Sequence, residues 1–545
     1  MKGRSPTFTQ VPLDIVGSTV FGRYPKISVE QTFNMIISDG FLVPYAGHME
    51  VAEIIPAGQG RALFASTIFN HMIAVIDNGV YVISPNLAVN RVGTISTFKG
   101  DVFIDENVSS QIAICDQQAI YIYNTVTGAF TKPNLPDNVS FGGSTFIPGY
   151  ISYQNNRFVA ASIGQPIWRL SAVNDGTSWP ADAQHEGTLQ TKPDNVVAAQ
   201  RFPGRGNLLY VFGKTVTEPW QDVGLQLFPY QRNSSVNIDY GCLNPATIAY
   251  NENIMVWLAA NEKSGPVIAY STGGDINRIS TDGIDFKFTT LTNPGNSYGF
   301  LFRQDGHLIY QLTFPDDNLT YIYDFNTKKF FTLCDENANA HIAKRIAFFN
   351  DKYYFVSFID GNLYQISTQF TTYNGKEIPR VRVCRNIRLP DGSRFAINNL
   401  TFTLEQGTQE NVFLSDNLLT EDDQIIMTQA GENITVGVGG LRTFIDEPLQ
   451  TQSGLDLLTE INENIFATVV SNFPQPIPQS VHLSVSKNGG ESFGTIWSKN
   501  LNPPGLFRNR LIYWQLGAAN DFVPQFRFWG LGRFVATDGI VSIYQ

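Results

Sequence analysis

A hairpin that recurs along the chain is the feature that most constrains the fold. Each copy has two short runs of alternating apolar residues joined by a tight polar turn, such as Asp77-Asn78-Gly79 in the first copy. Successive hairpins begin roughly 40 to 53 residues apart, which is the spacing of four-stranded propeller blades. They lie at Met72–Ser84, Ile112–Asn124, Phe158–Leu170, Leu208–Trp220, Met255–Tyr270, Leu308–Tyr323 and Tyr353–Ile366. The sequence therefore predicts an all-β protein with a six- or seven-bladed β-propeller over residues 46–375.

Two of the hairpins share a finer pattern that supports true repetition. Tyr121-Ile122-Tyr123 and Tyr321-Ile322-Tyr323 each end a second strand, and each leads through a turn centred on Asn-Thr to a phenylalanine. The 46 Gly and 28 Pro of the chain suit many short strands joined by tight turns. A β-sandwich with regular strand lengths gives the same spacing, so this alternative stays open at the level of the sequence.

The repeat stops near Tyr373, and the remaining chain has a different organisation. A chain of 545 residues is long enough for more than one domain. A compact β pattern returns at Val481 and runs to the end, but it is too short to bury a core alone. We therefore expect residues 376–404 and 481–545 to form an additional β domain from the terminal regions. Residues 1–45 are expected as an N-terminal arm, and residues 405–480 as an acidic, β-rich insertion.

A basic strip begins the second region. The strip contains six basic residues and only two acidic ones. The basic residues are Lys376, Arg380, Arg382, Arg385, Arg388 and Arg394. Residues two apart on a strand project from one face, so Arg380 and Arg382 should lie together. We expect Arg380, Arg382, Arg385 and Arg388 to line an interface or a channel, where they pair with the acidic insertion or with a partner protein. Contact with DNA phosphates is the alternative.

The insertion accounts for the net charge of the whole protein. Residues 405–480 contain twelve acidic residues and one basic residue, Arg442, which accounts for the formal net charge of −11. Apolar runs such as Ile425-Ile426-Met427 predict β-hairpins there and not a disordered tail. Like charges resist close packing, so Glu421, Asp422 and Asp423 are expected to face the channel or the distal tip of an assembly. A solvated outer loop is the alternative.

The sequence contains no recognisable catalytic or metal-binding motif. There is no G-x-S-x-G, phosphate loop or H-E-x-x-H, and the six histidines are scattered. His307 follows Asp305-Gly306 and is interpreted as a residue flanking a turn and not as a general base. We expect no enzymatic activity, no catalytic residue, no cofactor and no metal. The four cysteines lie far apart and are expected to be buried free thiols, and neither a secretory signal nor a membrane span is predicted.

Two segments resemble the Asp-box turn of sialidase propellers. Ser486–Phe493 has Asn488 in the place of the usual Asp, and Asn174–Trp179 is a looser copy. In this motif the Asn or Asp side chain binds neighbouring main-chain N–H groups, so it stabilises the fold and performs no chemistry. It nevertheless makes an Asp-box propeller glycosidase, or a receptor-binding protein, the alternative function. A retaining glycosidase needs two carboxyl groups in one pocket, which the sequence does not place.

An ordered series of short motifs runs from about Phe146 to Phe331. Its parts are Trp168 with Asn174–Trp179, Lys192-Pro193-Asp194, Leu209–Gly213 with Thr217-Glu218 and Trp220, Phe228–Arg232, Tyr240-Gly241-Cys242, Arg278–Thr281, and Gly306-His307 with Leu312–Pro315. In their order and spacing they resemble the packaged-DNA stabilisation proteins that form the tail hub, or nozzle, of short-tailed bacteriophages (podoviruses). Weaker similarity covers Asn34–Pro44 and Ser484–Phe493, and the acidic insertion has no counterpart.

This resemblance implies a structural part of the virion tail. It implies a homo-hexameric ring that is assembled in the host cytoplasm, binds the tail adaptor below the portal, and closes the channel to retain packaged DNA. A tail needle or plug and a tailspike or fibre are the further implied partners. DNA would pass through the lumen at ejection without sequence-specific binding, and an acidic wall suits such a conduit because like charge does not trap the duplex.

Overall fold

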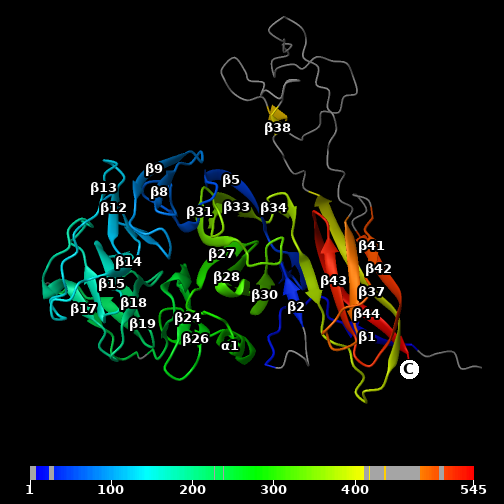
Figure 1. The fold of residues 1–545 in the computed structure, drawn as a ribbon. Helices are drawn as coiled ribbons and strands as arrows, with labels where there is room; N and C mark the ends of the chain where they lie inside the picture. Colours follow the sequence, from blue (N-terminus) through cyan, green and yellow to red (C-terminus); the bar gives the residue numbers. More distant parts are fainter. Residues whose placement is uncertain are drawn as a thin grey trace, which may run out of the picture.

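The computed structural model describes residues 8–23, 30–225, 228–236, 238–409, 416–417, 435–436, 479–502 and 508–544. They form two β structures side by side, a propeller and a smaller β-sandwich (Figure 1). The described residues contain one α-helix, α1 (Asp282–Thr289), and the 3₁₀ turns η1 (Ala183–His185), η2 (Pro245–Thr247) and η3 (Pro315–Asp317). None of these helices is long and apolar enough to cross a membrane.

The propeller has seven blades, and the innermost strands of neighbouring blades contact one another around its axis. The first three are β6 (Gly60–Ala65), β7 (Met72–Ile76), β8 (Gly79–Ile83), β9 (Val89–Thr94); β10 (Phe103–Glu106), β11 (Gln111–Cys115), β12 (Ile120–Asn124), β13 (Phe130–Thr131); and β14 (Pro148–Gln154), β15 (Arg157–Ser162), β16 (Ile167–Leu170), β17 (Glu186–Thr188). The next three are β18 (Val196–Arg201), β19 (Leu208–Gly213), β20 (Thr217–Asp222), β21 (Tyr230–Arg232); β22 (Gly241–Cys242), β23 (Ala249–Asn251), β24 (Ile254–Ala260), β25 (Val267–Ser271), β26 (Ile276–Arg278); and β27 (Tyr298–Gln304), β28 (His307–Phe314), β29 (Leu319–Asp324), β30 (Lys329–Leu333). The predicted all-β fold with a six- or seven-bladed propeller is confirmed, and the sandwich alternative for the repeat is excluded.

The seventh blade is completed by a strand from the other end of the repeat. β31 (Ala343–Phe349), β32 (Lys352–Ser357) and β33 (Gly361–Ser367) follow one another in the chain, whereas the fourth strand of the blade is β5 (Gly47–Ile55). β5 pairs antiparallel with β33. On its other side in the sheet lie the short strands β34 (Thr372–Tyr373) and β35 (Lys376–Glu377). Hydrogen bonds between the first and last parts of the repeat therefore close the ring.

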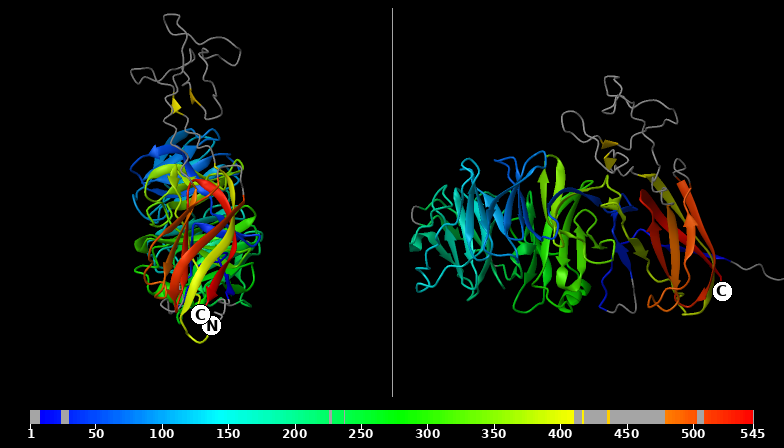
Figure 2. Two further views of the ribbon diagram at one scale, coloured as in Figure 1. Left: turned by 90° about the vertical axis from the view of Figure 1, so that its right-hand side faces the viewer. Right: turned by 45° about the horizontal axis from the view of Figure 1, so that its top comes forward.

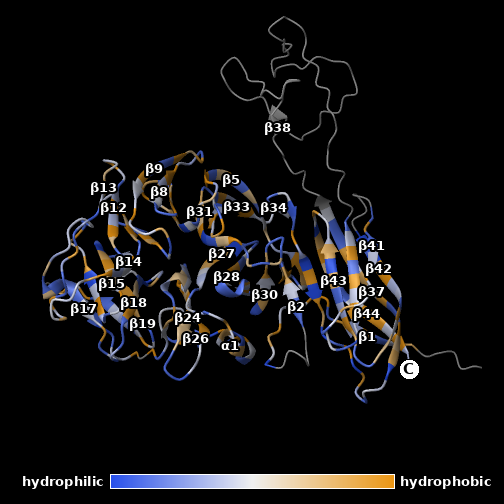
Figure 3. Ribbon diagram, in the orientation of Figure 1, coloured by the Kyte–Doolittle hydropathy of each residue, from blue (hydrophilic) through white to orange (hydrophobic). Residues whose placement is uncertain are grey.

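The blades are buried on both faces, which explains their continuous apolar strands. β7 and β8 are buried along their whole length, because each blade packs between two others. Aromatic rings fill the wedges between blades, and Trp168 contacts the rings of Trp220 and Tyr230 at centroid distances of 5.4 and 5.3 Å. Apolar residues accordingly lie mainly along the strands (Figure 3). All four cysteines are free and buried, as predicted.

The second domain is a sandwich of two sheets built from both ends of the chain (Figure 2). The outer sheet runs β3 (Met35–Ser38), β4 (Phe41–Pro44), β44 (Gly532–Tyr544), β37 (Phe395–Gln409), β42 (Arg508–Ala519), with β1 (Thr9–Leu13) on β44. The inner sheet runs β2 (Gln31–Phe33), β36 (Arg380–Val383), β43 (Val523–Trp529), β40 (Ser480–Ser486), β41 (Trp497–Asn500). The expected additional β domain of the terminal regions is thus present. β38 (Asp416–Asn417) and β39 (Thr435–Val436) pair only with each other among the described strands.

The segment expected as an N-terminal arm, residues 1–45, supplies β1 to β4. Leu13, Ile15 and Met35 are at most 2% exposed and belong to the sandwich core, together with residues of β37 and β43. Phe402 and Phe526 bring the two sheets together, with ring centroids 5.1 Å apart. In the described range these N-terminal residues are therefore integral to the second domain.

One sheet runs through both domains. β2 lies parallel to β30 of the sixth blade, with Phe33 opposite Thr332, and antiparallel to β36, with Thr32 opposite Arg382. The result is a continuous nine-stranded sheet from β27 in the propeller to β41 at the edge of the sandwich. Main-chain hydrogen bonds therefore join the domains, so we expect them to move as one body.

Ring closure gives a first prediction. A Cβ at Gly361, the first residue of β33, would lie 2.1 Å from the main-chain oxygen of Ile55 in β5 and 2.9 Å from a side-chain carbon of Ile76. Gly361→Ala should therefore destabilise the protein by about 1–3 kcal/mol, as overpacking does, measured by urea unfolding. Gly274→Ala is the matched control, because nothing lies within 4 Å of its Cβ position. Equal unfolding midpoints for the two variants would contradict this account of the closure.

Candidate functional site

The axis of the propeller contains a hollow of about 340 Å³. Its walls come from β6, β10, β14, β27 and β31 and from the stretch that runs from η2 into β23. All the lining side chains are apolar except the phenols Tyr150 and Tyr250 and the guanidinium of Arg345. Tyr250 and Phe348, which line it, are 42% and 54% exposed. In size the hollow lies within the range of small-molecule sites.

Arg345 is the single charged side chain that lines this hollow. Its Nη1 donates to the main-chain oxygens of Ala246 at 2.7 Å and Gly299 at 3.2 Å. The neighbouring Lys344 pairs with Asp101 at 3.5 Å, and burial lowers the pKa of this lysine. Arg345 itself has no ion-pair partner within the described part of the chain.

Asp105 is a buried carboxyl group between the second and third blades. It accepts hydrogen bonds from the main-chain N–H groups of Glu106 at 2.9 Å and Tyr153 at 2.7 Å. Burial raises its pKa to about 6, although Arg201 and the two N–H groups act in the opposite direction. Because its oxygens join β10 to β14, we assign Asp105 a structural role.

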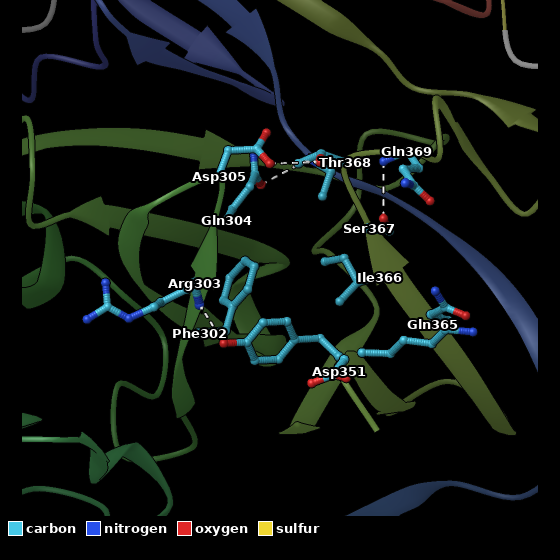
Figure 4. A pocket seen from close by; sticks show the side chains of 13 residues that line it. Phe302, Arg303, Gln304, Asp305, Asp351, Gln365, Ile366, Ser367, Thr368 and Gln369 are labelled. Atoms are coloured by element: carbon cyan, nitrogen blue, oxygen red, sulfur yellow. Dashed lines mark hydrogen bonds between the residues drawn. The ribbon is translucent and has the colours of Figure 1, made fainter. Parts of the chain in front are cut away.

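A second, polar pocket of about 300 Å³ lies between the sixth and seventh blades (Figure 4). Thr368 donates to Asp305 at 3.0 Å, and the main-chain N–H of Arg303 donates to the Tyr353 hydroxyl at 3.2 Å. Asp305 and Asp351 lie on opposite sides of the pocket, with Phe302 between them. This arrangement differs from the convergent carboxyl pair of a retaining glycosidase.

Ser38, His307 and Asp324 form a hydrogen-bonded chain that sequence reasoning missed. His307 Nε2 lies 3.1 Å from Ser38 Oγ, and Nδ1 lies 2.9 Å from an oxygen of the buried Asp324. This is the order of a Ser-His-Asp triad. It also connects the β3–β4 turn of the sandwich to the sixth blade. The sequence showed only that His307 flanks a turn, because Ser38 is 269 residues away.

Two of the four arginines expected at an interface are instead buried. Arg380 and Arg382 are 1% and 0% exposed, so the partner-facing role expected for them does not fit the structure. Arg382 donates three hydrogen bonds of 3.0 Å to main-chain oxygens of the N-terminal segment, those of Asp14, Ile15 and Ser18. It also pairs with Glu30 at 2.6 Å. The physical reason is that residues 14–18 of the N-terminal segment cross this face of β36, so that their main chain covers Arg382.

Arg380 has a comparable role on the same strand. Its guanidinium donates to the main-chain oxygens of Thr371 at 2.8 Å and Gly530 at 3.2 Å, and it lies over the Phe534 ring. Burial lowers its pKa to about 10, so it remains charged at neutral pH. Arg380 thereby connects the end of the propeller repeat to β43 and β44.

Of the other expected site residues, two lie on the surface and three lie outside the described residues. Arg385 and Arg388 are exposed, and Arg388 pairs with Asp521 of the same domain. Glu421, Asp422 and Asp423 lie outside the described residues. The structure therefore brings Arg380 and Arg382 together, as their spacing predicted, and leaves Arg385 and Arg388 on the surface.

Both Asp-box-like turns use the hydrogen bonds predicted for them. Asp175 accepts from the main-chain N–H of Thr177 at 2.9 Å, and Trp179 donates to the Gly176 oxygen at 2.8 Å. In the other turn, Asn488 accepts from the main-chain N–H of Ser492 at 3.1 Å. The interpretation of these segments as devices of the fold is confirmed.

No group of three or more His, Cys, Asp or Glu side chains suited to a metal ion occurs in the part of the chain that the structure describes.

A family described as "Bacteriophage P22 Gp10, beta-propeller" matches residues 20–371, which is more than half of the chain. The chain belongs to this phage stabilisation family. It is therefore a bacteriophage structural protein and a virion component, and the resemblance to the packaged-DNA stabilisation and tail-hub proteins is confirmed.

The wider comparisons gave only remote similarities. A search of curated proteins found no match. A streptogramin B lyase is 14% identical, with a TM-score of 0.40, over 59% of this chain and 97% of that chain. A virginiamycin B lyase from Staphylococcus aureus is 12% identical, with a TM-score of 0.42, over 59% and 99%. The N-terminal domain of Nup159 is 12% identical, with a TM-score of 0.37, over 62% and 98%. Scores this low carry no argument about the activity of this chain.

The buried arginines give a second prediction. Arg382→Met leaves Glu30 and three main-chain oxygens without their donor, so it should lower the free energy of unfolding by about 3 kcal/mol. Urea unfolding measures this loss, and limited proteolysis should show faster cleavage within residues 8–33. Arg385→Met, at an exposed position of the same segment, is the control and should change stability by less than about 0.5 kcal/mol. A stable Arg382→Met protein with a protected N-terminal segment would refute this role.

Proposed function

We propose that this protein is the tail hub, or nozzle, of a short-tailed phage. A ring of six copies binds the tail adaptor, closes the portal channel, retains packaged DNA and becomes the conduit for ejection. Membership of the phage stabilisation family over residues 20–371 is the observation that carries the proposal. A needle or plug and a tailspike or fibre complete the set of proposed partners, and the role requires no catalysis, cofactor or metal. Assembly in the host cytoplasm is part of the same proposal.

The rigid connection between the two domains supports the proposal that this protein bears a mechanical load. A closed seven-bladed ring and a nine-stranded sheet shared with the sandwich give a body held by main-chain hydrogen bonds. A component under the pressure of packaged DNA needs such a body. The insertion between β37 and β40 remains proposed for the channel or the distal tip, with Glu421, Asp422 and Asp423 as its charged residues.

An uncovered apolar surface supports assembly with a second copy. The outward face of the outer sheet carries Phe8, Trp514, Ile540 and Tyr544, which are 47%, 54%, 46% and 38% exposed. The strand registers place them on one side, with Asn399 opposite both Trp514 and Ser542, and Pro12 opposite Ile540. A sheet exposed to water normally presents polar residues on this side. We name these four residues the outer-sheet patch.

The size and position of this patch fit a subunit contact. Four strands about 4.8 Å apart and about eight residues long span on the order of 500 Å² before side-chain relief is counted. A stable contact buries about 800 Å² per partner, so the outward face of the outer sheet, with the patch on it, supplies more than half of one. It faces away from the propeller, where a neighbouring subunit can reach it (Figure 2). We therefore propose the outer-sheet patch as a contact between neighbouring copies in the ring.

Removal of a central aromatic ring tests this contact. Trp514→Ser in the virus that encodes the protein should reduce the yield of tailed, DNA-filled particles by about tenfold or more, because buried tryptophans dominate interface energies. Electron microscopy of particles and infectious titre measure the effect. Phe98→Ser, which removes a ring that is 62% exposed on the propeller, is the matched control. Normal tails on Trp514→Ser particles would exclude the patch as a contact, and wild-type particles without a six-fold ring of this chain would refute the proposed function.

The Ser38–His307–Asp324 chain is the one observation that favours an enzyme. Neither Ser38 nor His307 lines the axial hollow or the pocket between the sixth and seventh blades, and Asp324 also accepts hydrogen bonds from Asn326 and Thr327. We propose that the three groups hold the sandwich against the sixth blade and hydrolyse nothing.

A covalent probe tests this assignment. An activated serine Oγ attacks the phosphorus of a fluorophosphonate and displaces fluoride, whereas an ordinary serine does not react, so wild-type protein and Ser38→Ala should show the same background labelling by intact mass spectrometry. Labelling of wild-type Ser38 that disappears in Ser38→Ala, and that also disappears in Asp324→Asn, would establish a serine-type hydrolase instead.

A further inference from the structure

The axial hollow has the chemistry of a binding site that the hub role does not use. Apolar side chains line the hollow together with polar main-chain groups, and the rings of Tyr250 and Phe348 keep part of their surface exposed, although Phe348 also packs on Tyr353. A ligand with an apolar body would cover this exposed apolar surface and displace water from it. The hollow measures about 340 Å³, which suits a chain of several carbons or one to two aromatic rings.

Arg345 determines the charge of that ligand. Two hydrogen bonds from Nη1 to Ala246 and Gly299 hold its guanidinium in place, so little rotamer entropy is lost when it binds an anion. Its Nε and Nη2 have no acceptor within the described residues, and these two N–H groups form the fork that a carboxylate fits. The adjacent cation in the chain, Lys344, already pairs with Asp101.

The site therefore has two distinct parts. Arg345 provides the anion-binding part, while Tyr250 and Phe348 provide an aromatic part within the same cavity. The other lining groups of the hollow carry no charge that would repel an anion. We propose that the axial hollow binds a small amphipathic anion, a carboxylate on an aliphatic or aromatic body, with the carboxylate on Arg345 and the body against Tyr250 and Phe348.

Calorimetric titration of the full chain with octanoate, and with octanol as the uncharged counterpart, tests the proposal. Octanoate should bind one to one and more tightly than octanol. Arg345→Met should weaken octanoate by about tenfold to hundredfold, the usual value of a charge-assisted hydrogen-bonded pair, and leave octanol unchanged. Arg303→Met, in the polar pocket between the sixth and seventh blades, is the matched control and should leave both ligands unchanged.

A second variant keeps the test decisive if Arg345→Met unfolds. Phe348→Ser changes an exposed ring, so the protein should fold, and it should weaken octanoate and octanol alike by several-fold. Absence of saturable octanoate binding at millimolar concentration overturns the proposal. Equal affinity of wild-type protein for octanoate and octanol does so too, as does an Arg303→Met effect as large as that of Arg345→Met. None of these results depends on ring assembly, so the site and the hub function fail or stand separately.

Discussion

The pairing of β5 with β33 is the interaction on which the rest of the structure depends. A propeller is stable only when its last blade meets its first, and here the closing strand comes from before the first blade. The ladder runs from Gly47 opposite Ser367 to Ile55 opposite Gly361. Closing a loop of this length costs entropy that grows only slowly with its size, so one strand of main-chain hydrogen bonds offsets it. Because β5 directly follows β4, the same pairing also fixes the sandwich beside the seventh blade.

The buried arginines follow from this arrangement. Where the N-terminal segment crosses between sandwich and propeller, its main chain has oxygens that no strand partner satisfies. Arg382 provides donors for Asp14, Ile15 and Ser18, and Arg380 does so for Thr371 and Gly530. A guanidinium has five N–H groups in a fixed plane, so it can satisfy several carbonyls that no apolar side chain could. Burial of the charge is tolerated because each arginine is held by several acceptors.

The sequence predicted what depends on short-range pattern and missed what depends on distant contacts. Alternating apolar residues closed by turns revealed the blades, because a hairpin forms between neighbours in the chain. The spacing of Arg380 and Arg382 showed a shared face, but whether that face is covered depends on residues up to 368 positions away. For the same reason Ser38 was not connected with His307. The axial hollow was also missed, since no single strand contains more than a fraction of its wall.

The size of the hollow also constrains the proposed conduit. A cavity of about 340 Å³ that is lined by Tyr150, Tyr250 and Arg345 has the size of a small-molecule site. It is too small to admit a double helix. DNA in the proposed ring must therefore pass between subunits and not through the propellers. The wall that it meets is then a surface of the assembled ring, where six copies of each exposed charge are repeated around the axis. The exposed Arg385 can contribute to the potential of such a wall, whereas the buried Arg380 and Arg382 cannot face it.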